Sequence, residues 1–356
     1  MLRVGLVGCG KIADGHVEQI RAIGRADLVS VCDREPLMAE QLAVRLGVPK
    51  QYSNLAEMLG SERLDVLHIA TPPDTHVPIA RQALEAGCHL FVEKPFALTA
   101  EDAQVIFDLA REAGRRVSVN YLYNFEAPAL ELERLLAAGS LGSVVHIDSS
   151  YGYNLAGDYG LAVLSDPDHW VHRLPGKLFH NVLDHVVAKF VPYMSDDFAV
   201  KVFAFRRRPE SGIAKMDDMA DELRFMLRSG SLTVSGLVSA HARPVAHTLR
   251  VIGTRSTVDV DYGARTLVHL SGQSQPSALG RLLPPWGQAG QFARNGIRNL
   301  YQFAGSRFHY FECMRELLNR FYDAVEGSGP EPIPSLHVMR VCRVIDSIVT
   351  EVEQGR

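Results

Sequence analysis

The sequence predicts an α/β protein with two domains, a parallel sheet with crossover helices followed by an α/β domain on a largely antiparallel, open sheet. Over the first 125 residues, short β-branched runs alternate with helical patterns, which is typical of parallel sheets. After about residue 142 the pattern changes to period-two runs joined by turns. A glycine-rich turn also separates the first expected strand from the first expected helix.

In the first domain we expect five strands, each a short apolar run, at 3–8, 27–33, 65–71, 89–94 and 116–121. Helices are expected at 75–87 and 99–114. The second of these helices opens with Thr99 and Asp102 in positions typical of a capping box and closes on Gly114.

In the second domain two hairpins are expected, over 221–240 with Ser229-Gly230 at the turn, and over 247–262 around Gly253-Thr254. The tail "SLHVMRVCRVIDSIVTEVE" has apolar residues at helical spacing. We therefore expect a dinucleotide-binding domain at 1–125, a substrate and oligomerisation domain at 126–334, and a C-terminal helix at 335–356 that packs back on the first domain.

The composition is that of a globular protein, with 47% hydrophobic and 22% charged residues, which argues against disorder. A net charge of −4 gives no reason to expect nucleic-acid binding. The five cysteines show neither metal-ligand nor disulfide spacing, and the N-terminus has no signal-peptide core. No apolar stretch approaches the roughly 20 residues that span a bilayer. A soluble, cytoplasmic protein is expected.

The stretch "VGLVGCGKIADGH" places Gly8, Gly10 and Ala13 in a G-x-G-x-x-A pattern after a strand and at the start of a helix. The first glycine permits a tight turn, the second lets the backbone approach a pyrophosphate, and the helix N-terminus favours the anion. Asp33 ends the next strand, where an acid is expected to bind an adenosine ribose. The pattern predicts a Rossmann fold that binds NAD, while Arg34 leaves NADP open.

The stretch "HLFVEKPFAL" ends an apolar strand in Glu93, Lys94 and Pro95. In an open parallel sheet, ligands bind at the carboxyl ends of the strands, so Lys94 falls where a cofactor is expected. Pro95 restricts the backbone of Lys94. A lysine in this position can polarise or deprotonate a substrate hydroxyl.

These motifs resemble the glucose–fructose oxidoreductase / inositol dehydrogenase / rhizopine-catabolism (Gfo/Idh/MocA) family. The resemblance rests on "GLVGCGKIADGH" and "TPPDTHVPIARQALEAGCHLFVEKPFALTAEDA" and covers 1–125, with only architectural likeness beyond. It implies a nicotinamide-binding domain and a second domain whose open sheet often forms an oligomer interface. By position it implies these cofactor contacts: Gly8, Gly10, Lys11 and Ile12 at the pyrophosphate, Asp33 and Arg34 at the ribose, Thr71, Pro72 and His76 along the channel, and Glu93, Lys94 and Asn120 near the nicotinamide.

The resemblance also implies an Asp-x-x-x-His pair in the second domain. "LPGKLFHNVLDHVVAKF" supplies Asn181 and His185 instead, on one face of an expected helix. His185 is the candidate proton acceptor, because imidazole titrates near neutral pH, and Asn181 would orient it. Asp184 points about 100° away. The amine of Lys94 and the imidazole of His185 are expected to converge beside one nicotinamide ring.

Substrate contacts are expected from Tyr123, Trp170, Arg173 and His180; the histidine also fits a satisfied core residue. Tyr123 begins the segment where the family often has an arginine. A metal site at His169, His172, His180 and His185 is not expected, because "DPDHWVHRL" offers one H-x-x-H without the second pair of a tetrahedral set.

From Gly263 to Phe311 the sequence has no Asp or Glu. The segment interleaves arginines with aromatic residues, namely Arg265, Arg281, Arg294, Arg298 and Arg307 with Trp286, Phe292, Tyr301, Phe303 and Phe308. Pro284-Pro285 and several glycines argue against one long helix. The segment fits a loop packed on the sheet or on a second subunit, or a surface for anionic ligands, either a nucleotide-sugar diphosphate or a membrane face.

The expected function is hydride transfer between a secondary hydroxyl of a sugar, cyclitol or nucleotide-sugar and NAD(P), in a homo-oligomer. Two alternatives stay open. One is an NAD-using epimerase or lyase with transient oxidation. The other is a non-catalytic regulatory protein that keeps the dinucleotide fold.

Overall fold

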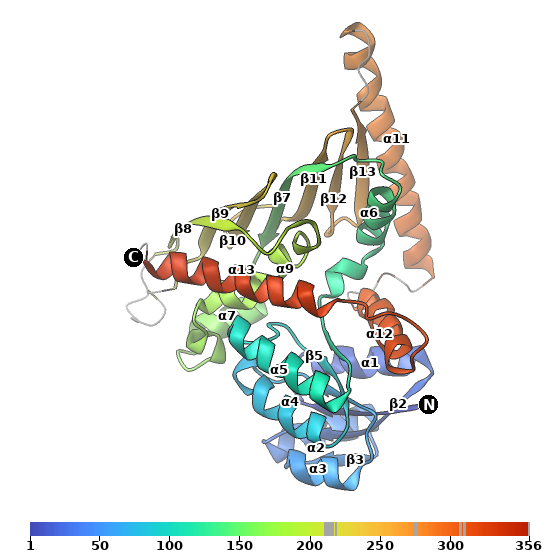
Figure 1. Ribbon diagram of the computed structural model, residues 1–356, viewed down its shortest axis with the longest axis vertical. Helices are drawn as coiled ribbons and strands as arrows, with labels where there is room; N and C mark the ends of the chain where they lie inside the picture. The colour runs from blue at the N-terminus through green and yellow to red at the C-terminus, as the bar shows by residue number, and fades with distance from the viewer. Residues whose placement is uncertain (210–216, 218, 273–276, 306–307, 309–310, 355–356) are drawn as a thin grey trace. The chain divides into compact units, whose positions relative to one another are not determined.

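The computed structural model describes residues 1–209, 217, 219–272, 277–305, 308 and 311–354. The chain divides into two compact units (Figure 1). The first combines Met1–Leu122 with Tyr310–Arg343, and the second combines Tyr123–His309 with Val344–Arg356. The expected boundary at residue 125 lies close to this division, but residues 310–334, expected in the second domain, group with the first unit.

The first unit is built on a six-stranded parallel sheet in the order β3-β2-β1-β4-β5-β6. Its strands are β1 (Leu2–Val7), β2 (Ala26–Cys32), β3 (Lys50–Tyr52), β4 (Val66–Ile69), β5 (His89–Val92) and β6 (Val117–Val119). The five expected strands are present, and β3 was not expected. The central strands are apolar and buried on both faces, as a sheet covered by helices requires. The predicted Rossmann fold is confirmed.

Helices of the first unit follow the strands in alternation. They are α1 (Ala13–Ile23), α2 (Pro36–Leu46), α3 (Leu55–Ser61), η1 (Pro73–Thr75), α4 (His76–Glu85), α5 (Ala100–Ala113), and α12 (Glu312–Val325). The caps predicted for α5 are confirmed, since Thr99 accepts a bond from the Asp102 amide and Gly114 ends the helix at φ 63°. The short 3-10 turn η2 (Leu122–Phe125) stands at the division between the units.

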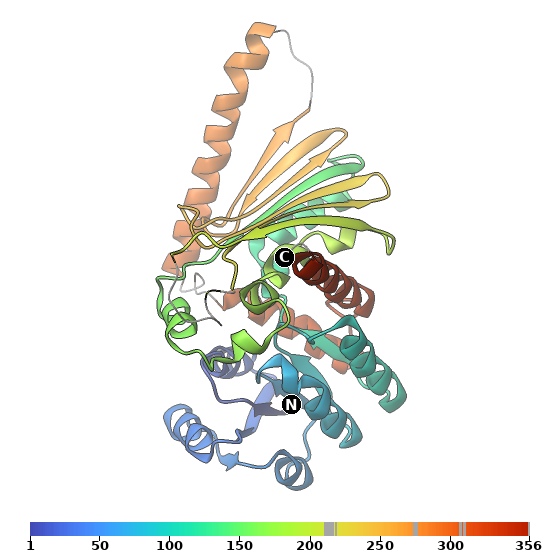
Figure 2. The same cartoon turned by 90° about the vertical axis from the view of Figure 1, so that its left-hand side faces the viewer.

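The second unit contains a seven-stranded sheet in the order β13-β12-β11-β7-β10-β9-β8 (Figure 2). Its strands are β7 (Val144–Gly152), β8 (Ala199–Phe205), β9 (Glu222–Ser229), β10 (Leu232–Ser239), β11 (His247–Gly253), β12 (Ser256–Asp261) and β13 (Thr266–Ser271). Only the β7–β10 pair is parallel. The largely antiparallel sheet and both hairpins are therefore confirmed.

Side chains alternate across this sheet. Leu223, Phe225 and Leu227 of β9 are buried, whereas Met226 between them is exposed. The helical elements of the unit are α6 (Ala127–Ala137), α7 (Asp158–Ser165), η3 (Trp170–Arg173), α8 (Lys177–Val182), α9 (Asp184–Val187), η4 (Val191–Tyr193) and α11 (Ser277–Ala304). The predicted tail helix is α13 (Ser335–Gln354), whose first residues group with the first unit and whose last group with the second.

The expectation that Pro284-Pro285 would prevent one long helix is wrong. Helix α11 runs through both prolines. Figures 1 and 2 show its first turns projecting past the end of β13. The prolines leave the carbonyls of Gly280 and Arg281 without helical donors, and these residues are exposed, so water can satisfy them. None of the helices in the described ranges is long and apolar enough to cross a membrane.

Candidate functional site

In the first unit, the candidate residues gather at the carboxyl edge of the parallel sheet. Gly8 follows β1, Thr71 follows β4, Glu93 and Lys94 follow β5, and Asn120 follows β6. These four strands are neighbours, and the strand order reverses between β1 and β4. Ligands bind in such sheets at this reversal.

The turn after β1 has the shape of a pyrophosphate cradle. Gly8 has φ 95°, and a Cβ there would lie 2.6 Å from the backbone carbonyl of Ala70, so only glycine fits. At Gly10 a Cβ would meet no atom within 4 Å, so the space beside its backbone is open. Helix α1 begins just beyond, with no side chain capping its N-terminus. Open backbone and uncapped amides suit an anionic phosphate, so these residues fit a dinucleotide.

Asp33 is fixed beside this cradle. Its carboxylate accepts a bond of 2.8 Å from the amide of Cys9 and one of 3.0 Å from the amide of Glu35. Arg34 and Lys11 are exposed. A carboxylate held in this place favours a ribose hydroxyl over a 2′-phosphate.

Glu93, at the carboxyl end of β5, is held by hydrogen bonds from neighbouring residues. The carboxylate is 6% exposed and accepts bonds from the side-chain amide of Asn120 at 2.5 Å, from His16 Nε2 at 2.9 Å and from the backbone amide of Lys94 at 3.1 Å. Burial alone would raise the pKa of Glu93, but the bonds from His16 and Asn120 and the charge of Lys94 lower it below its usual value. An ionised Glu93 therefore fixes the backbone of Lys94.

A buried chain of hydrogen bonds leads away from Glu93 into the core. His16 Nδ1 lies 2.8 Å from His68 Nδ1, and His68 Nε2 lies 3.0 Å from the hydroxyl of Tyr322. Burial and the neighbouring His16 lower the pKa of His68 well below its usual value, so His68 is neutral. A neutral His68 offers one ring nitrogen as donor and the other as acceptor, so its two nitrogens can bond His16 and Tyr322 in opposite senses.

Sequence reasoning missed His16, His68 and Tyr322. The G-x-G-x-x-A motif contains no histidine, and residues from α1, β4 and α12 meet only in the folded chain. The one available signal was a histidine inside the apolar run "DVLHIAT", because a buried polar side chain needs a partner.

His76 joins two loops of the same edge. Its ring is fully buried, with Nε2 2.9 Å from the carbonyl of Thr71 and Nδ1 3.0 Å from the carbonyl of Phe96. Burial lowers the pKa of His76. The ring thus holds the Thr71–Pro72 loop in place. Lys94 itself is half-buried.

In the second unit, the expected single helix bearing Asn181 and His185 is divided at Leu183 into α8 and α9. Leu183 keeps helical angles, so the chain direction continues through the division. Asn181 is 5% exposed and His185 is half-buried. The segment is tight at its start, where a Cβ on Gly176 would lie 2.6 Å from Val349.

The structure brings His185 together with Tyr123, and adds residues that the sequence analysis did not select. The ring of His185 lies 5.0 Å from Tyr123 and 4.7 Å from Tyr151, measured between centroids. His247 of β11 lies 4.2 Å from Tyr123 and 4.7 Å from Tyr262. We call His185, His247, Tyr123, Tyr151, Tyr262 and Lys189 the imidazole cluster.

Lys189 is the unusual member of the imidazole cluster. Its Nζ lies 4.9 Å from the ring centroid of Tyr262 and 3.5 Å from the carbonyl of Thr248. Burial lowers the pKa of Lys189 to about 7. Burial and the charges of Lys189 and His185 lower the pKa of His247 well below its usual value. His247 Nε2 is buried with no hydrogen-bond partner among the described residues. The signal for Lys189 was a lysine four residues after His185 in an apolar run.

The other candidate substrate residues lie near η3 and α8. Trp170 is half-buried, with its ring 5.7 Å from His169, and Arg173 is exposed and donates to the carbonyl of Asp168. His180 is 2% exposed. His172 Nε2 bonds the carbonyl of Val163 at 2.8 Å, so the H-x-x-H motif serves local backbone. Among the described residues no three His, Cys, Asp or Glu side chains are grouped for a metal.

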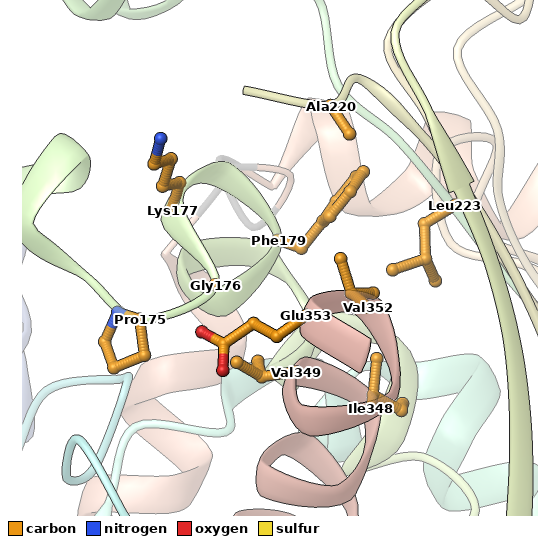
Figure 3. A pocket seen from close by; sticks show the side chains of 10 residues that line it. All are labelled: Pro175, Gly176, Lys177, Phe179, Ala220, Leu223, Ile348, Val349, Val352 and Glu353. Atoms are coloured by element: carbon orange, nitrogen blue, oxygen red, sulfur yellow. The ribbon is translucent and has the colours of Figure 1, made fainter. Parts of the chain in front are cut away.

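A cavity beside this segment is too small for a sugar. Figure 3 shows its lining side chains between α8 and the end of α13. The volume of the cavity is about 20 Å³. That volume holds about one water molecule. Its walls are largely apolar and come from Pro175, Gly176, Lys177, Phe179, Ala220, Leu223, Ile348, Val349, Val352 and Glu353.

Comparison with known proteins agrees with this geometry. The profile of the Gfo/Idh/MocA oxidoreductase family, described as an NAD-binding Rossmann fold, matches residues 2–121. Residues 2–121, about a third of the chain, therefore have the NAD-binding domain of this family. The uncharacterised oxidoreductase YdgJ of Escherichia coli is 26% identical over 97% of the chain and 94% of its own length.

Other relatives match over a shorter span. D-glucoside 3-dehydrogenase of Escherichia coli is 32% identical over 40% of the chain, and the match spans only 41% of that relative. Among solved structures, the WlbA dehydrogenase from Bordetella pertussis, in complex with NADH and UDP-GlcNAcA, aligns with a TM-score of 0.78. The two chains are 19% identical, with 100% of this chain and 96% of that one covered, which establishes the shared fold.

Proposed function

We propose that this protein is an NAD-dependent oxidoreductase that acts on a secondary hydroxyl of a sugar, cyclitol or nucleotide-sugar. The observation that carries the proposal is Lys94, whose backbone is held by an ionised Glu93 at the edge of the sheet where the glycine cradle lies. The match to the family profile over residues 2–121 and the dehydrogenase relatives support the reaction class. The neighbour bound to NADH and UDP-GlcNAcA supports the substrate class.

We assign the cofactor to the first domain. Gly8, Gly10, Lys11 and Ile12 would hold the pyrophosphate, and Asp33 the ribose, with Arg34 beside it. Thr71, Pro72, His76, Glu93 and Asn120 would shape the nicotinamide end. The bound nicotinamide supplies a hydride acceptor for the carbinol carbon.

Side chains of the protein would accept the hydroxyl proton of the substrate. His185 would take the hydroxyl proton as the carbonyl forms, and Asn181 would orient it. Lys94 would polarise the substrate oxygen, since an ammonium stabilises the negative charge that grows there. Within the imidazole cluster, Tyr123 packs on His185 and restricts its ring. Trp170, Arg173 and His180 would contact the sugar.

We further propose a reducing, cytoplasmic location and a homo-oligomer. The five cysteines are buried and form no disulfide among the described residues, which suits a compartment that keeps thiols reduced. The open face of the second sheet exposes Phe203, Phe205 and Met226, an apolar surface of the kind that subunits bury.

The test begins with mass spectrometry of ligands retained on the purified protein. A panel of nucleotide-sugars, sugars and cyclitols is then screened with NAD and with NADP by absorbance at 340 nm. We expect NADH to form with at least one member of the panel, and NAD to be preferred over NADP. Retained NAD without net NADH formation would point to epimerisation or elimination. Cofactor binding without any turnover across the panel would contradict the proposal.

A further inference from the structure

Helix α11 is amphipathic, but it packs against the protein with its polar face and not with its apolar face. Gln291 exchanges two hydrogen bonds with the backbone of His269 in β13, at 2.8 and 3.0 Å. Asn295 donates to the carbonyl of Leu267 at 2.8 Å, and Asn299 donates to that of Ala264 at 2.8 Å. Strand β13 is the edge of the sheet, so α11 satisfies backbone groups that an edge strand leaves open.

The opposite face of α11 is apolar and exposed. Successive helical residues turn by about 100°, so the residues opposite Asn295 form one stripe along the helix. That stripe, which we call the outer face, consists of Leu279, Leu282, Leu283, Trp286, Ala289, Gly290, Ala293, Ile297, Leu300, Tyr301 and Ala304. Trp286 is 73% exposed, Ile297 70%, Leu300 68% and Tyr301 78%. A continuous exposed stripe of this size marks an interaction surface.

The charge beside the outer face distinguishes between the two partners that could cover it, a second copy of the chain and a lipid bilayer. Arg294 is exposed beside the outer face, about 80° from its centre, whereas Arg281 is exposed on the side of Asn295. The sequence from 263 to 311 contains no Asp or Glu. Two copies packed through α11 would bring their Arg294 side chains together with no acid of the segment to pair them. Anionic lipid headgroups would complement Arg294. Trp286 and Tyr301 are also residue types that favour the membrane–water interface.

We propose that the outer face of α11 binds the surface of an anionic lipid bilayer. The helix lies in the plane of the interface, with its leucines, Ile297 and Trp286 in the acyl boundary and Arg294 at the headgroups. At Gln291, Asn295 and Asn299 the polar side is bonded to β13 and the residues before it. The first turns of α11 project past the sheet (Figures 1 and 2). Leu282 is 59% exposed and Trp286 73%, so both side chains are accessible to a bilayer. Arg265, expected in the same basic surface, is instead buried against Glu126 at 2.8 Å, and Arg307 lies outside the described residues.

The test uses the full chain and vesicles of phosphatidylcholine with 30% phosphatidylglycerol, compared with pure phosphatidylcholine. We expect co-sedimentation with the anionic vesicles that weakens as salt rises. A variant with Leu282→Glu, Trp286→Glu and Ile297→Glu should bind at least tenfold more weakly. The matched control, Leu37→Glu with Val44→Glu, changes exposed apolar residues of α2 and should bind like the parent.

Fluorescence gives an independent readout, because the chain has only two tryptophans. In a Trp170→Phe variant, the remaining Trp286 should shift its emission to the blue on anionic vesicles and be quenched by brominated lipid. No shift and no sedimentation at low ionic strength would overturn the proposal. Loss of oligomer mass in the triple variant, measured by light scattering without vesicles, would assign the outer face to a second copy and also overturn it.

Discussion

The two groups of candidate residues are buried by different means. At the edge of the Rossmann sheet, Glu93, His16, His68 and Tyr322 are joined by consecutive hydrogen bonds. In the imidazole cluster of the second unit, rings pack on rings, and His247 and Lys189 are desolvated rather than bonded into a chain. Bonded networks are rigid and specific, whereas desolvated groups change their charge readily.

This difference fits the two proposed roles, cofactor binding at the edge of the Rossmann sheet and proton transfer in the imidazole cluster. A cofactor returns with the same structure in every turnover, so a rigid edge suits its binding. Proton transfer needs groups whose pKa lies near the working pH, and in the imidazole cluster burial brings the pKa of Lys189 to about 7. Each substitution below changes a residue of one group and leaves the other group intact.

The largest effect is expected from His185→Ala. Loss of a general base lowers turnover by about 10²- to 10⁴-fold, while binding of NAD stays within about threefold. Steady-state kinetics and NAD titration measure both quantities. Imidazole added to the buffer should restore part of the rate. Turnover within threefold of the parent would remove His185 from the chemistry.

A smaller effect, on stability, is expected from His68→Phe. The substitution removes the hydrogen-bond partner of His16 Nδ1 and of the Tyr322 hydroxyl, at a cost of about 1–3 kcal/mol for each orphaned group. Tyr322→Phe removes one hydroxyl and should cost about 1 kcal/mol. Urea unfolding of the full chain compares them. Equal free energies of unfolding in both variants and the parent would mean that this chain of hydrogen bonds does not stabilise the fold.

For Gly10→Ala we expect NAD affinity to fall by about tenfold, since a methyl group fills the open cradle. The thermal midpoint should hold, because no protein atom lies within 4 Å of the new Cβ. Gly60→Ala, at an equally open position in α3, is the matched control and should leave affinity unchanged. Calorimetric titration with NAD measures the difference, and unchanged affinity in Gly10→Ala would place the pyrophosphate elsewhere.

An effect that develops only with rising pH is expected from Lys189→Met. The folded chain holds the pKa of Lys189 near 7, below the ordinary 10.5, so between these values the unfolded chain binds the extra proton. Lys189 therefore makes the parent more stable as pH rises from about 7 toward 10, by roughly 1 kcal/mol per pH unit. Thermal melting across this range should be flatter in the variant. Identical slopes would mean that Lys189 titrates normally.

Much of the fold follows from local sequence. The apolar runs, the caps of α5 and the turn glycines specified the parallel sheet and both hairpins. Strand β3 was missed, because Lys50-Gln51-Tyr52 is short and polar and gains its pairing from β2. Helix α11 was missed because proline rules describe an isolated helix, whereas Gln291 and Asn295 anchor this one to β13.

The residues of the candidate site also fall into those that the sequence reveals and those that only the fold reveals. Residues in contiguous motifs, such as Gly8, Gly10, Glu93 and Lys94, could be selected from the sequence. His16, His68 and Tyr322, and likewise His247 and Lys189, are remote along the chain and meet only through the sheets. No spacing rule connects them.

The most direct test of the account measures turnover and NAD affinity together in Lys94→Met, which keeps the length of the side chain and removes its charge. The account predicts that turnover falls by about 10²-fold or more while the NAD dissociation constant stays within about threefold. Turnover equal to that of the parent, at unchanged affinity, would contradict it.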